Sequence, residues 1–385
     1  MRSVGLDLGV RHIAYCEVAS GAVMRRGSVR RLSELATVVG PETEPARVAF
    51  EASREAWHVH DTVHGWGHEP LIVDTTRVKQ LGVGQHGRKR DAIDAEMLAL
   101  ALDGGRLPLA HVLSPERRAL RARLSVRSEL VDMRARQVTV VRGLARAKGV
   151  LIASSTTSAF LAHLEKAALD EQTRALIAPL VATLRTAEMQ IAVVDQELAT
   201  LAKADPTICL CATAPGVALV VAATFVSTID DAKRFRDAHS VASYLGLVPG
   251  EKTTGGTKQR LGAITKHGNA QARCMLVQAA WHILRAGSKD DPLHRWGTNI
   301  ATKRGKKVAS VAVARRLAGV LWAMWRDGTV YDAALVGRAS ATGLRRASQD
   351  LGVIADAMSR AVKKIQNRER RAHAIRTKTS GAAMT

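Results

Sequence analysis

The stretch RKRDAIDAEML, residues 88 to 98, places two carboxylates beside three cations. Asp91 and Asp94 stand three residues apart, so on a helix both side chains project from one face. Acidic residues are also favoured in the first turn of any helix, because they face the positive end of the helix dipole. The stretch is therefore compatible both with an ordinary helix start and with a pair of metal ligands.

Two further carboxylates occupy apolar, strand-like runs. Asp7 lies inside VGLDLGV, and Glu51 ends the run RVAFE. A buried strand rarely carries an unpaired carboxylate, because removing it from water costs several kcal/mol. Four carboxylates on two strands and a helix could instead hold Mg²⁺ or Mn²⁺, both of which take oxygen ligands. Two such ions about 4 Å apart can clamp the attacking and leaving oxygens of a phosphodiester.

The charge of the chain favours a polyanionic partner. Its 385 residues include 57 Lys and Arg against 35 Asp and Glu, a net charge of +22. Nucleic acid is the commonest partner for such a protein, and an anionic membrane is the rival. We therefore expect Arg88, Lys89 and Arg90 to hold a nucleic-acid strand beside the carboxylates. The four cysteines form no CxxC pair and no signal peptide is apparent, so we expect a cytoplasmic, nucleoid-associated protein.

The first part of the chain, 1–112, is predicted to be an α/β domain of the ribonuclease-H type. Three strand-like runs follow one another, and helix and strand patterns then alternate. The expected strands are 3–10, 12–19, 22–29, 47–52 and 70–76, and the expected helices are 32–39 and 54–64.

Residues 113–205 are predicted to be helical. Ser114 is suited to cap a helix, with Pro115 at its first position. Farther along, apolar residues alternate spacings of four and three, which is a heptad seam. This seam predicts either a coiled coil between chains or a helical hairpin within one chain; its members are Leu180, Leu184, Ala187, Ile191, Val194, Leu198 and Leu201.

Residues 206–334 form the third predicted unit, which is mainly α-helical. Its uncharged segment 207–229 is long enough to span a bilayer. The Pro215-Gly216 pair interrupts it, so we favour a buried turn and helix, as in helix-hairpin-helix modules that present backbone amides to phosphate. The tail 335–385 is rich in Lys and Arg and is expected to be an electrostatic arm on nucleic acid.

The stretch GLDLGVRH has another interpretation. A strand and loop with Asp and Gly also begins the sugar kinases and actin-like ATPases, where it cradles phosphate. Those proteins need a second glycine-rich phosphate loop, and the sequence has no convincing one.

Taken together, the ordered motifs resemble the IS110-family transposases, also called DEDD recombinases. The resemblance rests on VGLDLG, AFEAS and RDAIDAEMLA, and then on TAPGVALVVAATFVSTI, ASYLGLVPGEKTTGG, ITKHGNAQAR and KRGKKV. It covers nearly the whole chain. It implies a RuvC-like domain, a helical coiled-coil region and a C-terminal transposase domain. Asp7, Glu51, Asp91 and Asp94 fall on the family's catalytic acids.

The resemblance also implies a hydroxyl nucleophile, which in the family is a serine before glycine. Here the segment reads GEKTTGG, so the matching residue is Thr254. A threonine hydroxyl can attack phosphorus, but its β-methyl restricts the rotamer and crowds the approach. The alternative is that this loop only binds the nucleic-acid backbone. The expected phosphate contacts here and in the later basic helix are Lys258, Arg260, Lys266, Arg304, Lys306 and Lys307.

What the resemblance implies for mechanism is RNA-guided recombination. A structured guide RNA, the bridge RNA, would pair with donor and target DNA, and paired dimers, forming a tetramer, would carry out strand exchange. The hydroxyl would attack a phosphodiester activated by Mg²⁺ and form a covalent protein–DNA link. Two alternatives stay open: a RuvC-like nuclease that only hydrolyses, and a non-catalytic nucleic-acid-binding relative.

Overall fold

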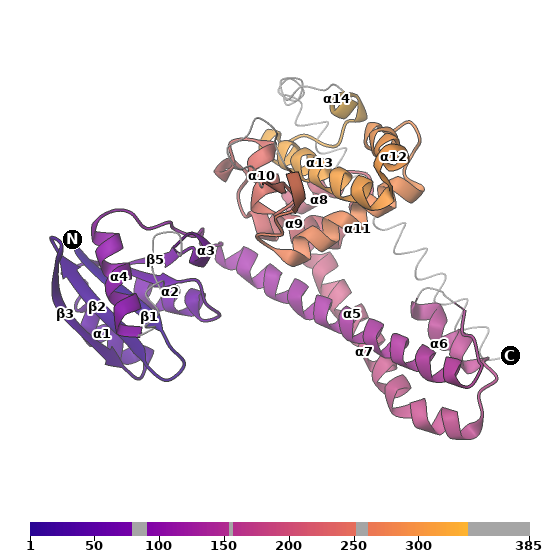
Figure 1. Cartoon of the computed structure of the whole chain (residues 1–385), viewed down its shortest axis with the longest axis horizontal. Helices are drawn as coiled ribbons and strands as arrows, with labels where there is room; N and C mark the ends of the chain where they lie inside the picture. Colours follow the sequence, from indigo (N-terminus) through magenta and orange to yellow (C-terminus); the bar gives the residue numbers. More distant parts are fainter. Residues whose placement is uncertain (79–90, 154–156, 252–260, 338–385) are drawn as a thin grey trace. The chain divides into compact units, whose positions relative to one another are not determined.

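The computed structural model describes residues 1–78, 91–153, 157–251 and 261–337. The chain divides into two compact units, Met1–Leu113 and a second that begins at Ser114. The first contains a mixed sheet with helices, and the second is mainly helical (Figure 1).

The N-terminal unit is built on a five-stranded sheet with the order β3-β2-β1-β4-β5. Its first three strands form an antiparallel meander, whereas β4 and β5 run parallel to β1. This mixed sheet with its helices fits the expected RuvC-like α/β domain. The strands are β1 (Arg2–Leu8), β2 (Ile13–Ala19), β3 (Ala22–Val29), β4 (Ala46–Glu51) and β5 (Glu69–Val73).

Helices cover both faces of this sheet. Val4, Leu6 and Phe50 pack with α1 (Leu35–Val39) and α2 (Ala56–Gly65) in one core. The opposite face packs on α4 (Asp91–Asp103), whose apolar residues contact Ala49 and β2 (Figure 1). A short α3 (Thr75–Val78) follows β5. Successive strand residues therefore serve opposite cores, as the alternation of side chains along a strand requires.

The contact between α4 and β1 is close enough to require glycine. A Cβ atom at Gly5 would lie 2.2 Å from the Ala95 carbonyl oxygen and 2.6 Å from the Ala99 nitrogen. Farther along, the Ser3 hydroxyl donates to the Asp103 carboxylate at 3.1 Å. Because Ser3 meets the end of α4 and Gly5 meets its middle, the helix runs antiparallel to β1.

The second unit opens with two long helices, α5 (Pro115–Ala147) and α7 (Glu171–Ala204), joined through α6 (Thr157–Glu165). Ser114 caps α5 as expected, accepting from the Arg117 amide with Pro at the first position. α5 and α7 lie side by side (Figure 1). Two ion pairs join the helices and a third joins α5 to Asp205, the residue that follows α7. Their partners run in opposite sequence order, so the helices are antiparallel: Arg117–Asp205, Arg127–Asp195 and Arg134–Glu188.

The heptad seam of α7 packs within the chain. Leu184, Ala187, Ile191 and Leu198 are buried, whereas Leu201 is 41% exposed. α5 is the main partner of α7, so the intramolecular hairpin is the arrangement in this structure. A coiled coil between chains through this seam is not confirmed.

The remaining helices enclose the largest core of the molecule. The segment 207–229 forms two short helices rather than one long helix, and Val221–Ile229 is buried throughout, as the turn-and-helix interpretation predicted. The bounds are α8 (Pro206–Cys211), α9 (Leu219–Ile229), α10 (Ala238–Tyr244), β6 (Pro249–Glu251), β7 (Leu261–Ile264), α11 (Ala270–Ala286), α12 (Pro292–Arg304), α13 (Lys306–Asp327) and α14 (Ala333–Gly337).

By length and apolar composition alone, two described helices could cross a membrane. They are α7 and α13, whose most apolar windows are 22% and 67% buried within the structure. Most of the apolar window of α13 is therefore buried in the core, whereas in α7 the buried residues are a minority of the window.

We expect Gly5→Ala to disrupt the N-terminal unit. The new methyl group would meet helix backbone, which cannot rotate away, so α4 would have to shift. Overpacking of this kind should reduce the free energy of unfolding by about 3 kcal/mol or more, measured by urea unfolding. Gly65→Ala is the matched control, because no atom lies within 4 Å of its Cβ position. Equal stability of the two variants would contradict the close packing.

Candidate functional site

Asp7 and Glu51 come next to each other at one edge of the sheet. β1 and β4 are parallel, and their register pairs Leu6 with Phe50. Asp7 and Glu51 each follow one residue later, so the two carboxylates occupy neighbouring positions on neighbouring strands. Both residues are partly buried.

Both positions belong to the sheet face that α4 covers. Asp7 is two residues after Gly5, which touches α4, and Glu51 is two residues after Ala49, which packs in a core with Leu98. Residues two apart on a strand share a face. The alternation of the strands therefore assigns both carboxylates to the side of α4.

The start of α4 is level with these carboxylates. From Gly5 to Asp7 the strand advances about 6.6 Å. The antiparallel helix covers about 6 Å in four residues, counted from its contact at Ala95 towards its N-terminus. This count ends in the first turn of α4, which contains Asp91 and Asp94. The packing of the helix thus directs the acidic turn towards the strand carboxylates.

A divalent cation fits this arrangement by donor type. The residues offer carboxylate oxygens, which are the ligands that Mg²⁺ and Mn²⁺ prefer. Among the side chains that the structure describes, no three His, Cys, Asp or Glu groups lie close enough to hold a metal ion. The side chain of Asp91 lies outside that description, so the four-carboxylate cluster stays a prediction.

The second part of the predicted site is a hairpin in the C-terminal unit. β6 and β7 pair antiparallel, with Glu251 opposite Leu261. The segment 252–260 joins these two ends. Thr254, Lys258 and Arg260 therefore lie outside the described residues, as do Arg88, Lys89 and Arg90 near α4.

The base of this hairpin is fixed to the helical core. A Cβ at Gly246 would lie 2.0 Å from the His267 carbonyl oxygen, and one at Gly268 would lie 2.0 Å from the Tyr244 carbonyl oxygen. The Arg273 guanidinium donates to the carbonyls of Leu245, His267 and Gly268 at 2.9 to 3.2 Å. The hairpin therefore projects from a rigid support.

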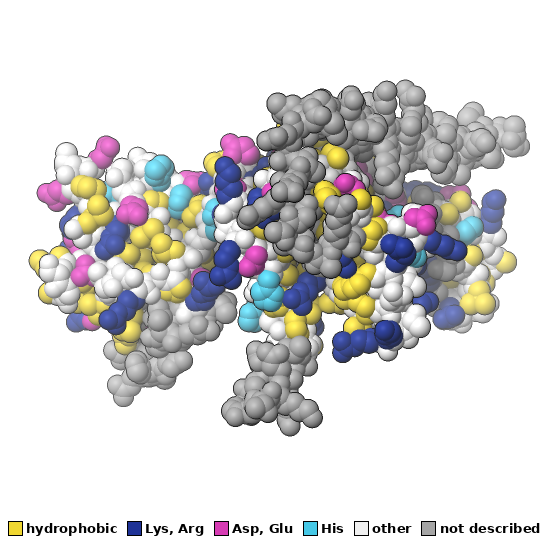
Figure 2. All heavy atoms as spheres, turned by 90° about the horizontal axis from the view of Figure 1, so that it is seen from above, with side chains coloured by type: hydrophobic (Ala, Val, Ile, Leu, Met, Phe, Trp, Pro, Cys, Tyr) yellow, Lys and Arg dark blue, Asp and Glu magenta, His cyan; other side chains and the backbone are white. Residues whose placement is uncertain are grey.

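The described basic candidates are exposed. Lys266 lies at the hairpin base with φ +56°, and Arg304, Lys306 and Lys307 gather where α12 ends and α13 begins. On the face seen in Figure 2, Lys and Arg side chains are spread among the described residues and are more prominent than Asp and Glu. A phosphate can contact these exposed cations without any rearrangement of the protein.

Sequence reasoning missed the residues that position the acids. Asp103 accepts from both Ser3 and the Gly21 amide, so it holds the end of α4 against the sheet. Gly5 had a usable signal, because a glycine inside an apolar strand indicates close backbone approach. Asp103 had none, since its partners are distant in sequence.

Two family models match the chain. Residues 4–147 match the IS110-type DEDD transposase model, and residues 210–295 match the model described as "Transposase IS116/IS110/IS902 family". The two matches cover the sheet with α4 and α5, and then the region from α8 to the start of α12.

Individual proteins are similar over most of their length. A probable family 20 transposase of Pseudomonas aeruginosa is 30% identical over 294 residues, 74% of this chain and 86% of its own. The transposase of insertion sequence element IS1111A of Coxiella burnetii is 24% identical, covering 84% of this chain and 89% of its own. That of IS1328 of Yersinia enterocolitica is 25% identical, covering 85% and 98%.

We expect Mg²⁺ or Mn²⁺ to stabilise the N-terminal unit through the carboxylates. At a free cation concentration of 100 Kd, binding adds about 2.7 kcal/mol to the stability of the folded state. Asp7→Asn and Asp94→Asn should lose most of this gain in a thermal-unfolding titration.

Asp132→Asn is the control for this titration, because Asp132 is an exposed carboxylate on α5. It should keep the full cation-dependent rise in Tm. An equal rise in all of these variants would show that the cation binds elsewhere.

Proposed function

Because the chain belongs to the IS116/IS110/IS902 family of transposases, we propose that it exchanges DNA strands through its carboxylates and the Thr254 hydroxyl. Insertion-sequence transposition is the activity of the family. The observation that supports the proposed site is the register of β1 and β4, in which Leu6 pairs with Phe50, each one residue before Asp7 and Glu51.

In this proposal Asp7, Glu51, Asp91 and Asp94 hold Mg²⁺ or Mn²⁺. When bound, the cation supplies charge stabilisation to the phosphodiester that reacts. The protein contributes the fixed arrangement: two strand ends and one helix turn that cannot move independently, because Gly5 locks α4 onto β1. Arg88, Lys89 and Arg90 precede the helix and would bind the phosphates of the same strand.

The Thr254 hydroxyl is proposed as the nucleophile. A bond forms between the threonine oxygen and phosphorus, and the bond from phosphorus to one sugar oxygen breaks, leaving a sugar hydroxyl. Attack by a second strand hydroxyl on the protein–DNA link would complete the exchange. The clamped base of the β6–β7 hairpin supports this assignment, since a nucleophile needs a fixed point of attachment.

We further propose that a structured guide RNA selects the donor and target DNA, as in the family that the motifs resemble. The net charge of +22 supports a chain that binds more than one polyanion. Lys258, Arg260, Lys266, Arg304, Lys306 and Lys307 would contact backbone phosphates. We expect the complex to form on cytoplasmic, nucleoid DNA.

Self-association is proposed to use the outer face of α7. Opposite its buried seam, this helix carries a second row of residues at spacings of three and four, all exposed and uncharged: Ala175, Ala178, Ala182, Thr186, Met189, Val193, Gln196 and Thr200. An outward face of a long surface helix is ordinarily charged. Since Met189 and Val193 are 60% and 51% exposed, a second copy could bury them.

Thr254→Ala should abolish covalent attachment of DNA, whereas Thr254→Ser should retain or increase it. Serine has the same hydroxyl without the crowding methyl group. The measurement uses protein with its co-purified RNA, Mg²⁺ and a labelled suicide DNA substrate, followed by denaturation to reveal label on the protein. Asp94→Asn should abolish the adduct while leaving DNA binding within about two-fold.

The alternatives give different outcomes in the same experiment. Free cleaved DNA without an adduct, equal in the wild type and both Thr254 variants, would contradict the recombinase and leave a metal-dependent nuclease. DNA binding with neither adduct nor cleavage in any protein would leave a non-catalytic binding relative.

A double change, Met189→Glu with Val193→Glu, should reduce the oligomer to a smaller species. Two charges on the proposed contact face would have to be desolvated on association. Light scattering coupled to size-exclusion chromatography would measure the molar mass. Thr183→Glu with Gln190→Glu is the control, because it adds the same charge to exposed sites beside that row. Identical masses for both double variants would contradict association through this face.

A further inference from the structure

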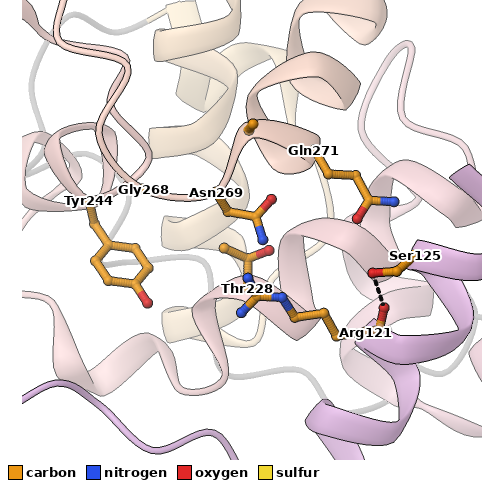
Figure 3. Close-up of a pocket in the computed structure, with 8 residues that line it drawn as sticks. Arg121, Ser125, Thr228, Tyr244, Gly268, Asn269 and Gln271 are labelled. Carbon is orange, nitrogen blue, oxygen red and sulfur yellow. Dashed lines mark hydrogen bonds between the residues drawn. The ribbon is translucent and has the colours of Figure 1, made fainter. Parts of the chain in front are cut away.

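A cavity of about 460 Å³ opens in the C-terminal unit between α5, α9, α10 and the start of α11. Arg121 and Ser125 of α5 form one side of it, and Tyr244 at the end of α10 forms another. Asn269 and Gln271 line it from the start of α11 (Figure 3). Its volume is in the range of sites for nucleotide-sized molecules, about 300–1,000 Å³.

The two carboxamides present complementary groups to this cavity. Asn269 uses its carbonyl oxygen to cap α11, accepting from the Ala272 amide at 2.9 Å. Its amide nitrogen points into the cavity in Figure 3. Gln271 uses its amide nitrogen to donate to the Leu124 carbonyl at 2.9 Å, so its carbonyl oxygen faces inward. The cavity is thus lined by one donor and one acceptor, the two kinds of group that pair with the edge of a nucleobase.

An aromatic ring stands across from these carboxamides. Tyr244 is held by Phe235, with ring centroids 5.2 Å apart, and by the Arg234 guanidinium 5.3 Å from its centroid. It nevertheless keeps 39% of its surface exposed. A fixed, exposed ring is a stacking platform for a base, and such stacking does not require a particular sequence.

The charge of the cavity favours an anion. Arg121 extends into it towards Thr228 and Asn269 (Figure 3), and none of its described lining residues is a carboxylate. α11 also directs the positive end of its dipole towards this side, which adds to the field of the guanidinium. A phosphate attached to the base would therefore find a cation within the same cavity.

We propose that this cavity binds one unpaired nucleotide of a nucleic-acid strand, with its phosphate at Arg121, its base stacked on Tyr244 and its edge at Asn269 and Gln271. The inference rests on the proposed function, because it assumes a nucleic-acid partner. It adds a site at which one nucleotide is separated from its stacked neighbours in the strand. A base inside a duplex cannot enter, since both its faces and its pairing edge are occupied.

The cavity lies next to the base of the β6–β7 hairpin, so a nucleotide bound in it would affect how the strand meets that hairpin. Tyr244 and the turn before Asn269 are the same backbone segments that clamp the base of the β6–β7 hairpin. A nucleotide bound here would fix the strand relative to that hairpin. Recognition of one unpaired nucleotide would then set the register of the strand.

The test is photocrosslinking of the full chain to 12-nucleotide strands that carry one 5-iodouracil, which couples to aromatic side chains under long-wave ultraviolet light. Peptide mapping should place the crosslink at Tyr244 for a single strand and reduce it at least ten-fold for the same strand in a duplex. Tyr244→Phe should keep the crosslink and Tyr244→Leu should lose it. A DNA strand and an RNA strand of the same sequence, compared directly, identify which polymer supplies the nucleotide.

Matched variants distinguish binding in the cavity from general attraction of the strand to positive charge. Arg121→Gln should weaken binding of the single strand five- to ten-fold by fluorescence anisotropy, whereas Arg123→Gln should change it less than two-fold. Arg123 is an exposed cation on the same helix outside the cavity. Asn269→Asp keeps an acceptor for the helix cap but adds negative charge, so it should lower the crosslink yield without lowering Tm.

Two results would overturn the proposal. Strand binding with the crosslink elsewhere, and equal effects of Arg121→Gln and Arg123→Gln, would remove the cavity site and leave the proposed transposase function intact. Absence of binding to every strand would remove both. Because this readout needs no strand cleavage, it is also independent of whether Thr254 forms an adduct.

Discussion

The contact between the α4 backbone and Gly5 is the constraint on which the N-terminal site depends. A helix crossing a strand normally stands off by the length of its side chains, about 10 Å between layers. Here the Ala95 carbonyl occupies the place that a Cβ would take. This approach fixes the helix along β1, and the Ser3–Asp103 bond fixes its far end. These two contacts hold α4 along β1.

Under the proposed function, this constraint also explains how like charges could be brought together. Carboxylates that converge repel one another, and folding alone gives no reason to gather them. The apolar contacts of α4 with Ala49, Val73 and the β2 residues are made without any contribution from the acids. Packing energy elsewhere in the unit can therefore hold an arrangement that is unfavourable at the site itself, until a cation or a strand with its counterions occupies it.

The sequence predicted the order of the five strands and of α1, α2 and α4 in the first unit because apolar strand-like runs alternate there with helical patterns, but it did not predict the short α3. It also predicted where Asp7, Glu51 and the helix of Asp94 belong. It could not show that Glu17, another carboxylate in a strand-like run, is held by cations from distant parts of the unit. Glu17 is buried and paired with Arg2 at 3.2 Å and Arg25 at 2.5 Å, so it is a structural ion pair. Those pairings depend on strand register and long side chains, which local patterns do not encode.

The seam of α7 shows the same limit. Heptad spacing predicts that a row of apolar residues is covered, but it does not say by which helix. The ion pairs with α5 decide in favour of the same chain, because three of them match only in the antiparallel hairpin. The uncharged outer row of α7 was not predictable from the sequence, because alanine and threonine are only weakly hydrophobic. The row becomes apparent only from the shared exposure of its residues in the structure. The cavity beside Tyr244 was likewise hidden, since its walls come from helices more than a hundred residues apart.

The proposed chemistry is divided between the two units, and this division has a physical consequence. The acids belong to Met1–Leu113, whereas the hairpin that bears Thr254 belongs to the unit beginning at Ser114. Neither unit alone contains both a nucleophile and the groups that activate its target. Under the proposed function, each unit is therefore inactive by itself, and reactivity requires that an acid cluster and a hairpin meet at the same DNA strand. An enzyme that cuts DNA without using water as the nucleophile gains specificity from this separation. Only the correct complex provides enough binding free energy to bring the nucleophile and the acids together.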